Sequence, residues 1–407
     1  MQSHSAHLSR QIRAGSHNPW LIKEAFFPPI RWRFVTAMLL TFFPFGILYP
    51  LEWPLRELLT IISWLWVFPS PVGCLSLLLL PALPSETLGY SAFNLLCFSM
   101  TLAVGYAALD CQTIGKQTFV DLHRFARFCI TFTVIIGVLQ AVSDPLQWTA
   151  IFKDMSLGAG GRGAGLRAEP SYLAAPLALY LALLVSRMGS ATGPSRRRLL
   201  GEALVITLVM VILTRSLSVL IVAMCFGPSF GLRVKNTAVS LICVLTGAGF
   251  AFLVFGERLR QAFEDTGSVI ELMTTGVSSW RNVPDFLIVL NYKDFLLPSN
   301  PAEIRTKVNT LAALLSSDFS WIESTFSTFS AGASTAGLVV TAFVLFAGLI
   351  VGLKHVRSRG LRWTWAMLYV ANWFFIPKFE AAGWVSLGLL AITSGKNQAL
   401  VRREDQS

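Results

Sequence analysis

Residues 158–186 read GAGGRGAGLRAEPSYLAAPLALYLALLVS, and this stretch joins a glycine-rich loop to a long apolar run. A run of about 17 to 25 apolar residues is typical of a membrane-spanning helix, because a helix rises about 1.5 Å per residue and the hydrocarbon core is about 30 Å thick. Arg162, Arg167 and Glu169 therefore lie at a predicted membrane boundary. Charge costs less there than at the bilayer centre, and an anionic lipid headgroup lies at about the same depth.

The composition indicates an all-α polytopic integral membrane protein. Hydrophobic residues make up 54% of the 407-residue sequence and charged residues only 14%, and the apolar residues occur in continuous runs. A β-barrel would instead show alternating segments of about ten residues. The runs predict about 12 transmembrane helices, with about 10 or 11 as alternatives.

The net charge of +11 is explained by the loops of such a protein. In a soluble protein this charge would suggest nucleic acid, but Lys and Arg are enriched in cytoplasmic loops of membrane proteins. The triple arginine at 196–198 is the strongest marker of this kind. We therefore expect no nucleic-acid partner. The six cysteines show no metal-binding spacing, and we expect neither a metal nor a cofactor.

The loops divide the chain into segments, with both termini expected in the cytoplasm. The predicted segments are a cytoplasmic tail (1–33), spans one to nine (34–255) with an outer loop (143–169), a large partly helical extracytoplasmic loop (256–330), spans ten to twelve (331–395) and a cytoplasmic tail (396–407). Within them, the polar segment 110–127 is expected to be an inner loop before a span at 128–142. Residues 332–353 are expected to form one span.

Two regions allow alternative readings. Residues 199–232 fit either one crossing or two, and we expect two, because two crossings keep Arg233 and Lys235 in the cytoplasm. The turn between them, at 214–216, would then be extracytoplasmic. The apolar runs at 55–68 and 74–83 are short, and they form either two spans or one re-entrant hairpin.

The large loop at 256–330 is expected to be extracytoplasmic and functional. It carries six basic and nine acidic residues, in contrast to the basic inner loops. Loops longer than about 12 to 15 residues are usually functional or disordered. Asn300, Pro301 and Glu303 have the pattern of a helix start, and an apolar face follows at 304–315. We expect a small folded lid, or a structured loop that covers helix ends.

Several arginines are predicted on the outer side, where arginine is normally rare. They are Arg162, Arg167, Arg215 and Arg281, with Glu169 among them. A guanidinium fork fits phosphate oxygens, so these arginines are suited to binding a lipid diphosphate. Arg162, Arg167 and Arg215 are the candidate diphosphate ligands. Arg215 fits a snorkelling interfacial residue equally well. The glycines of the 158–165 segment would allow the backbone to approach a ligand closely.

Four segments together resemble the O-antigen polymerase and O-antigen ligase superfamily. They are GRGAGLRAEPSYLAAPLALYLALL (161–184), LTRSLSVLIVAMC (213–225), SSWRNVPDFLIVL (278–290) and FSAGASTAGLVVTAF (329–343). The resemblance covers roughly half of the chain. One departure is that a glycine-rich element, usual in the family after the loop arginine, is replaced here by LLPSNPAE at 296–303.

This resemblance implies a metal-independent glycosyltransferase in the bacterial inner membrane. A glycan would leave undecaprenyl diphosphate and join a hydroxyl of an acceptor sugar at the outer face. Arg167 and Arg281 would stabilise the charge that develops on the diphosphate. Glu169 would accept the proton of the hydroxyl, or pair with Arg167 or Arg215. Asp285 and Asp294 are reserve candidates for the base.

Further expectations concern partners and the kind of transfer. The expected partners are membrane lipids, the undecaprenyl-diphosphate-linked glycan, a chain-length regulator and a flippase. Ligases of the superfamily are associated with a histidine in the large loop, whereas 256–330 contains none here, so we expect a polymerase rather than a ligase. A polysaccharide flippase or other transporter is a third possibility. It is disfavoured by the lack of a repeat and of a charge in the middle of a span.

Overall fold

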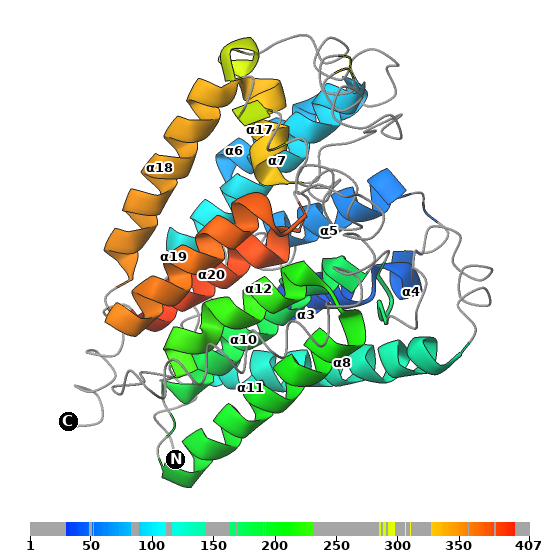
Figure 1. The fold of residues 1–407 in the computed structure, drawn as a ribbon, viewed down its shortest axis with the longest axis vertical. Helices are drawn as coiled ribbons and strands as arrows, with labels where there is room; N and C mark the ends of the chain where they lie inside the picture. The colour runs from blue at the N-terminus through cyan, green and yellow to red at the C-terminus, as the bar shows by residue number, and fades with distance from the viewer. Residues whose placement is uncertain are drawn as a thin grey trace, which may run out of the picture.

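The structure is a computed structural model of the chain (Figure 1). It describes residues 30–48, 51, 53–82, 89–110, 116–143, 163–167, 170–189, 191, 193–230, 285, 288–289, 292–297, 306, 310, 327–356, 358–377 and 380–394. The predicted span at 236–255, both tails and most of the large loop lie outside these residues. In the large loop, Thr306 and Thr310 are helical, in agreement with the helix predicted there.

The described part of the chain is all-helical, as predicted. Its thirteen α-helices are α3 (Ile30–Phe42), α4 (Pro44–Leu48), α5 (Trp53–Val67), α6 (Pro71–Ser76), α7 (Gly89–Asp110), α8 (Lys116–Val142), α10 (Ala174–Met188), α11 (Gly193–Thr214), α12 (Leu217–Phe226), α17 (Thr328–Ala336), α18 (Leu338–His355), α19 (Arg359–Phe374) and α20 (Ala381–Ser394). Short 3-10 helices are η1 (Leu77–Ala82), η2 (Pro170–Leu173), η3 (Gly227–Phe230) and η4 (Tyr292–Phe295).

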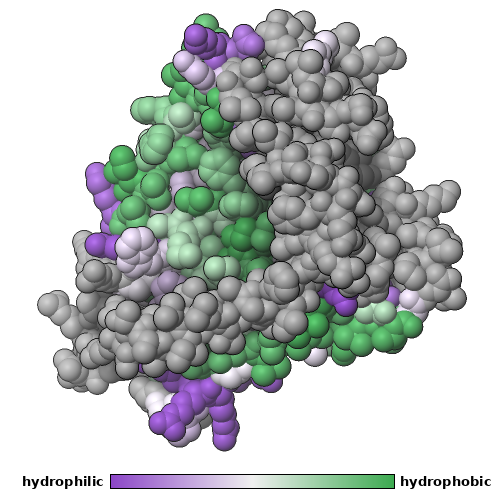
Figure 2. Space-filling view, in the orientation of Figure 1, coloured by the Kyte–Doolittle hydropathy of each residue, from purple (hydrophilic) through white to green (hydrophobic). Residues whose placement is uncertain are grey.

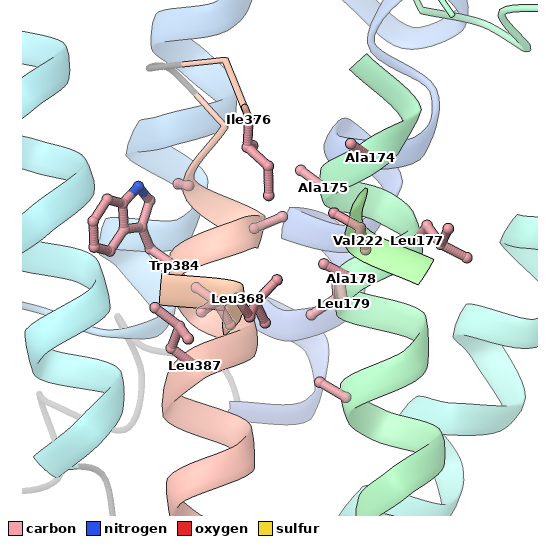
Figure 3. Close-up of a cluster of buried hydrophobic side chains, with 14 of the residues drawn as sticks. Ala174, Ala175, Leu177, Ala178, Leu179, Val222, Leu368, Ile376, Trp384 and Leu387 are labelled. Atoms are coloured by element: carbon pink, nitrogen blue, oxygen red, sulfur yellow. The ribbon is translucent and has the colours of Figure 1, made fainter. Parts of the chain in front are cut away.

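Helix α10 lies at the centre of the bundle. Its side chains are almost all buried, and it packs against α8, α11, α12 and α20. Figure 3 shows Ala175, Ala178 and Leu179 on the side of α10 that faces α20. Small side chains let helix backbones approach closely, and in lipid such packing takes the place of the hydrophobic effect as the force between helices. The apolar half of the 158–186 stretch thus forms the core around which the other helices pack.

Helices α8 and α18 expose large hydrophobic side chains to the surroundings. The exposed residues recur at spacings of three and four along each helix, so they share one face. They are Phe128, Phe132, Ile135, Leu139 and Val142 on α8, and Val339, Phe343, Phe346 and Ile350 on α18. Figure 2 shows hydrophobic side chains, in green, on the surface of the described part of the chain. Apolar faces of this extent suit contact with lipid rather than water.

Three helices in the described residues are long and apolar enough to cross a membrane. They are Thr118–Val142, Pro170–Met188 and Leu338–His355. Shorter apolar helices accompany them, namely Trp32–Phe42, Leu95–Ala108, Leu217–Phe230 and Ala381–Thr393. These lengths and compositions indicate a membrane protein.

Several predicted spans agree with the observed helices. Helix α7 coincides with the span predicted at 90–109, and α19 and α20 form the predicted last hairpin. In the region 199–232, α11 ends at Thr214 and α12 begins at Leu217 after a two-residue turn, at the place predicted for a turn. Figure 1 shows α12 folding back beside α11. Two helices, rather than one, therefore occupy this region.

Other predictions were wrong in their boundaries. Helix α8 begins at Lys116, so most of the segment predicted as an inner loop is helical. It is helical because Leu122 and Ala126 face the core while Arg124 and Arg127 point outward. The span predicted at 332–353 is broken at Gly337, whose φ of 85° ends α17 and redirects the chain into α18. Region 71–82 consists only of the short α6 and η1.

Polar contacts hold three helices together at one end of the bundle, here called the basic end. Glu202 of α11 accepts a hydrogen bond from Tyr180 of α10 at 2.7 Å and lies 3.4 Å from Nε of Arg127 of α8. His123 of α8 lies 3.0 Å from Arg187 of α10. The triple arginine 196–198 begins α11 at the same end. The opposite end therefore holds the ends of α8 and α11 and the beginning of α10.

Close packing between α7 and α20 gives a test of the fold. A Cβ atom on Gly388 would lie 2.7 Å from the carbonyl carbon of Ala108. We expect Gly388→Val to destabilise the protein by about 1 to 3 kcal/mol through overpacking. The measurement is the melting temperature in detergent. Gly201→Val is the control, because a Cβ there would meet no atom within 4 Å. Equal melting temperatures for the two variants would contradict the packing.

Candidate functional site: a buried arginine and glutamate cluster

The loop at 163–167 is fastened to the ends of α8 and α11 opposite the basic end. The amide of Gln140 on α8 donates to the carbonyl oxygen of Gly165 at 2.7 Å and accepts from the backbone N–H of Ala164 at 2.9 Å. The N–H of Gly163 donates to the carbonyl oxygen of Leu213 at 3.0 Å. These hydrogen bonds therefore fix the conformation of the loop at this end of the bundle.

Two glycines allow this loop to lie directly on α8. A Cβ on Gly163 would come within 2.5 Å of the carbonyl oxygen of Gly137. Gly165 has a φ of 60°, which side chains other than glycine rarely adopt, and it faces Thr133. At these two positions the glycine backbone lies close to helix α8, whereas the sequence predicted that it would lie close to a ligand. Gly158, Gly160 and Gly161 lie outside the described residues.

Arg167 follows these glycines and is completely buried. Its Nη1 donates to the carbonyl oxygen of Thr41 at the end of α3, and its Nη2 contacts Oε1 of Glu380, just before α20. The guanidinium also lies over the ring of Tyr172, 5.9 Å from the ring centroid. One side chain thus connects the loop with α3, η2 and α20.

Two further charged residues from α5 complete the cluster. Arg56 and Glu57 are each 1% exposed, and Nη2 of Arg56 donates to the carbonyl oxygen of Leu51 at 2.7 Å. Glu57 interacts electrostatically with both Arg56 and Arg167. Arg56, Glu57, Arg167 and Glu380 are called the arginine–glutamate cluster below. Two arginines balance two glutamates, so the formal charges cancel.

The electrostatics of this cluster are unusual for a bundle interior. Burial lowers the pKa of Arg167, and the nearby Glu57 carboxylate opposes that effect. Among the described residues, Nε of Arg167, Oε2 of Glu57 and Oε2 of Glu380 have no hydrogen-bond partner. Buried polar groups are nearly always hydrogen-bonded in proteins, and exceptions concentrate at functional sites. The cluster is therefore a candidate for the functional centre.

The structure places two of the five predicted site residues, and both lie at this end. Arg167 is in the cluster. Arg215 is exposed in the turn between α11 and α12, with a φ of 45°. The hydrogen bond from Gly163 joins the Arg167 loop to Leu213 at the end of α11, two residues before Arg215. The other predicted residues, Arg162, Glu169 and Arg281, lie outside the described residues.

Sequence reasoning missed three members of the cluster, Arg56, Glu57 and Glu380. The signal for two of them was present, because an Arg-Glu pair interrupts the apolar run WPLRELLTIISWLWV at 53–67. Charged residues inside an apolar run are expensive and often functional. Glu380 lies in a short turn between two apolar helices, where a glutamate is unremarkable. Only the fold shows that this turn reaches Arg167.

A second polar centre contains Asp285, Ser327 and Ser330 and is called the Asp285 centre. The hydroxyl of Ser327 donates to Oδ1 of Asp285 at 2.5 Å, and the two serine Oγ atoms are 2.9 Å apart. Burial raises the pKa of Asp285 to about 7, and the hydrogen bonds from Ser327 and Ser330 partly oppose that rise. Asp294, the other reserve base, is exposed on η4. Within the described residues, no group of three His, Cys, Asp or Glu side chains is placed to hold a metal ion.

A separate apolar groove of about 270 Å³ opens between α7, α18, α19 and α20. Its lining includes Tyr106, Phe343, Trp365, Tyr369 and Trp384. It has no charged residue among those that line it, so it offers nothing to bind an anionic group.

Comparisons with protein-family models, with curated proteins and with solved structures found no match to this chain.

The pairing of Arg167 with Glu380 predicts a characteristic stability pattern. Glu380→Ala leaves the buried guanidinium without its contacting carboxylate, and we expect a loss of about 3 to 5 kcal/mol. The double variant Arg167→Met with Glu380→Leu removes both charges and should be more stable than Glu380→Ala alone. The measurement is thermal unfolding in detergent, with Arg124→Ala as a control, since that side chain is 67% exposed. If the double variant lost as much stability as Arg167→Met and Glu380→Leu lose together when made singly, the two residues would not be coupled.

Proposed function

We propose that this protein is a polymerase of lipid-linked oligosaccharide repeat units, such as those of an O-antigen, a capsule or an exopolysaccharide. It transfers a glycan from undecaprenyl diphosphate to a hydroxyl of an acceptor sugar. The observation that carries the proposal is the buried Arg167. This arginine belongs to the loop that resembles the polymerase and ligase superfamily, and it lies among charged side chains at the end of the bundle opposite the basic end.

The proposed setting is the bacterial inner membrane. The protein has about 12 spans, both termini lie in the cytoplasm and the arginine–glutamate cluster lies on the outer side. The basic residues at the beginning of α11 support this orientation, because basic loops are retained in the cytoplasm. A lipid-linked donor would then present its diphosphate at the depth of the 163–167 loop. A flippase that supplies the donor and a chain-length regulator are the expected partners.

The proposed roles follow from position and charge. Arg162 and Arg215 bind oxygens of the diphosphate, and Arg281 joins them from the large loop. Arg167 is too buried to be the first contact and its charge is balanced by Glu380, so its role is to fix the loop that carries Arg162. The positive charge at the leaving group comes from the other three arginines, and such preorganised charge is usually a large part of catalysis, because it stabilises charge that develops in the transition state. Glu169 either accepts the proton of the hydroxyl or orients Arg167 and Arg215.

A transporter is the second candidate, and one observation favours it. The arginine–glutamate cluster buries charges inside the bundle, as substrate or ion pathways do. The described cluster is balanced in charge and is closed by its own pairings, which suits a fixed scaffold better than a path. A ligase, which would transfer the glycan to lipid A-core, remains the alternative within the same reaction class.

An assay with purified protein tests the proposal. We expect a ladder of polymer from polyprenyl-diphosphate-linked repeat units alone, without a lipid A-core acceptor. Arg167→Ala should abolish the ladder. Arg167→Lys should restore it only in part, because an ammonium cannot span the contacts to Thr41 and Glu380 in the way a guanidinium does.

The controls and outcomes separate the candidate functions. Arg124→Ala, at the basic end, should leave the ladder unchanged. Product that appears only with a lipid A-core acceptor would identify a ligase. Absence of product with either acceptor, in a protein that moves the lipid-linked glycan across vesicle membranes, would identify a transporter. Wild-type activity in Glu169→Gln would remove that carboxylate from the mechanism.

The proposed orientation has its own test. Single cysteines replace Leu217 or Ser195 in a cysteine-free background and are treated with a membrane-impermeant thiol reagent in intact cells. Both positions are exposed, whereas the neighbouring Ser216 is buried and would label poorly. We expect labelling of Leu217→Cys from outside and of Ser195→Cys only after the membrane is opened. Labelling of both from the same side would contradict the two-crossing topology.

A further inference from the structure

Asp285 is a reserve candidate for the base in the sequence, and the Asp285 centre has no role in the proposed reaction so far. Asp285 is 8% exposed and lies against the first turn of α17. Ser327 is the N-cap of that helix and accepts a hydrogen bond from the N–H of Ser330 at 3.0 Å. The carboxylate is thus held by two hydroxyl-bearing residues of a rigid helix end.

The Asp285 centre and the arginine–glutamate cluster share one short turn. Ser327 forms an isolated antiparallel bridge with Pro377, in the turn between α19 and α20. Three residues later the same turn ends at Glu380, whose N–H donates to the carbonyl oxygen of Pro377 at 3.0 Å. Phe329 also packs on Phe374, with ring centroids 5.1 Å apart. The turn therefore connects Ser327, which holds Asp285, with Glu380, which contacts Arg167.

We propose that Asp285, and not Glu169, is the proton acceptor for the incoming sugar hydroxyl, which leaves Glu169 the orienting role. This inference rests on the proposed glycosyl transfer. The hydroxyl oxygen forms a bond to the anomeric carbon of the donor, and the bond from that carbon to the diphosphate oxygen breaks with both electrons leaving on the diphosphate. The hydroxyl proton moves to Asp285. The arginines stabilise the diphosphate, and no other reactant is required.

The local charges favour Asp285 over the two carboxylates of the arginine–glutamate cluster. Glu380 contacts Arg167, and Glu57 lies close to two arginines. A neighbouring positive charge stabilises the ionised carboxylate and so weakens it as a base. Asp285 forms no ion pair with any described residue, and its partners are hydroxyl groups. Its basicity is therefore closer to what proton transfer near neutral pH requires.

Burial, rather than a neighbouring charge, shifts the pKa of Asp285. Helix α17, which holds it, carries no charged side chain. The turn behind Ser327 carries Glu380, which is paired with Arg167, and Lys378, which lies outside the described residues. Because burial raises the pKa of Asp285 to about 7, the protonated form stabilises the folded protein, and this contribution is lost as pH rises through about 7.

The experiment compares Asp285→Asn with wild type in the polymerisation assay across pH 5 to 9. In wild type, kcat/KM should rise about tenfold per pH unit and level off above about pH 7. Asp285→Asn keeps a hydrogen-bond acceptor for Ser327 but cannot take a proton. We expect kcat to fall by about 10²- to 10⁴-fold with KM for the lipid-linked donor nearly unchanged, and the pH dependence near 7 to disappear. Asp121→Asn, at the basic end, is the matched control.

Two further measurements guard against an effect on folding. The melting temperature of wild type should decrease between pH 5 and 8 by more than that of Asp285→Asn. Ser327→Ala keeps the carboxylate and removes a hydrogen bond that lowers its pKa, so the midpoint of the pH profile should move to higher pH. An unmoved midpoint in Ser327→Ala, or wild-type kcat in Asp285→Asn, would overturn the assignment. Wild-type protein that makes no polymer would instead refute the proposed function itself.

Discussion

The ion pair between Arg167 and Glu380 is the contact on which the end of the bundle opposite the basic end depends. Both side chains are buried, and a single charge left without its partner would cost several kcal/mol. The pair can form only if the 163–167 loop and the 375–380 turn meet. Since Arg167 also donates to Thr41, the end of α3 is fixed by the same guanidinium. One side chain therefore sets the relative positions of segments that are far apart in the sequence.

This constraint has particular weight in a protein that packs in lipid. Apolar helices gain little from associating there, because lipid tails are as apolar as their side chains, so polar pairs and close packing select the arrangement. Small residues on α10 give the close packing. The arginine–glutamate cluster gives the selectivity, since a shifted helix would separate charges that have no water to replace their partners. Its four members come from α5, a loop and a turn, so the cluster forms only when the bundle is complete.

Sequence patterns predicted those features that depend on local composition. The central helix follows from one long apolar run, and the turn at 214–216 follows from basic residues on both sides of an ambiguous region. Helix α8 begins earlier than predicted because buried positions such as Leu122 continue its core-facing side through a charged segment. The break at Gly337 depends on a positive φ. The pairing of Glu380 with Arg167 is a tertiary contact between residues more than two hundred positions apart, and no local pattern records it.

A glycosyl transfer from a lipid diphosphate requires two electrostatic environments that are incompatible at one point. The leaving group needs concentrated positive charge, whereas a carboxylate that takes a proton near neutral pH must be kept away from such charge. The turn between α19 and α20 contacts both polar centres of this structure. Glu380 at one end of it is paired with Arg167, and Pro377 at the other is bridged to Ser327, which holds Asp285. In the proposed reaction these two environments would serve different steps, because Asp285 is held by hydroxyl groups, whereas the carboxylate of Glu380 at the other end of the turn is held by Arg167.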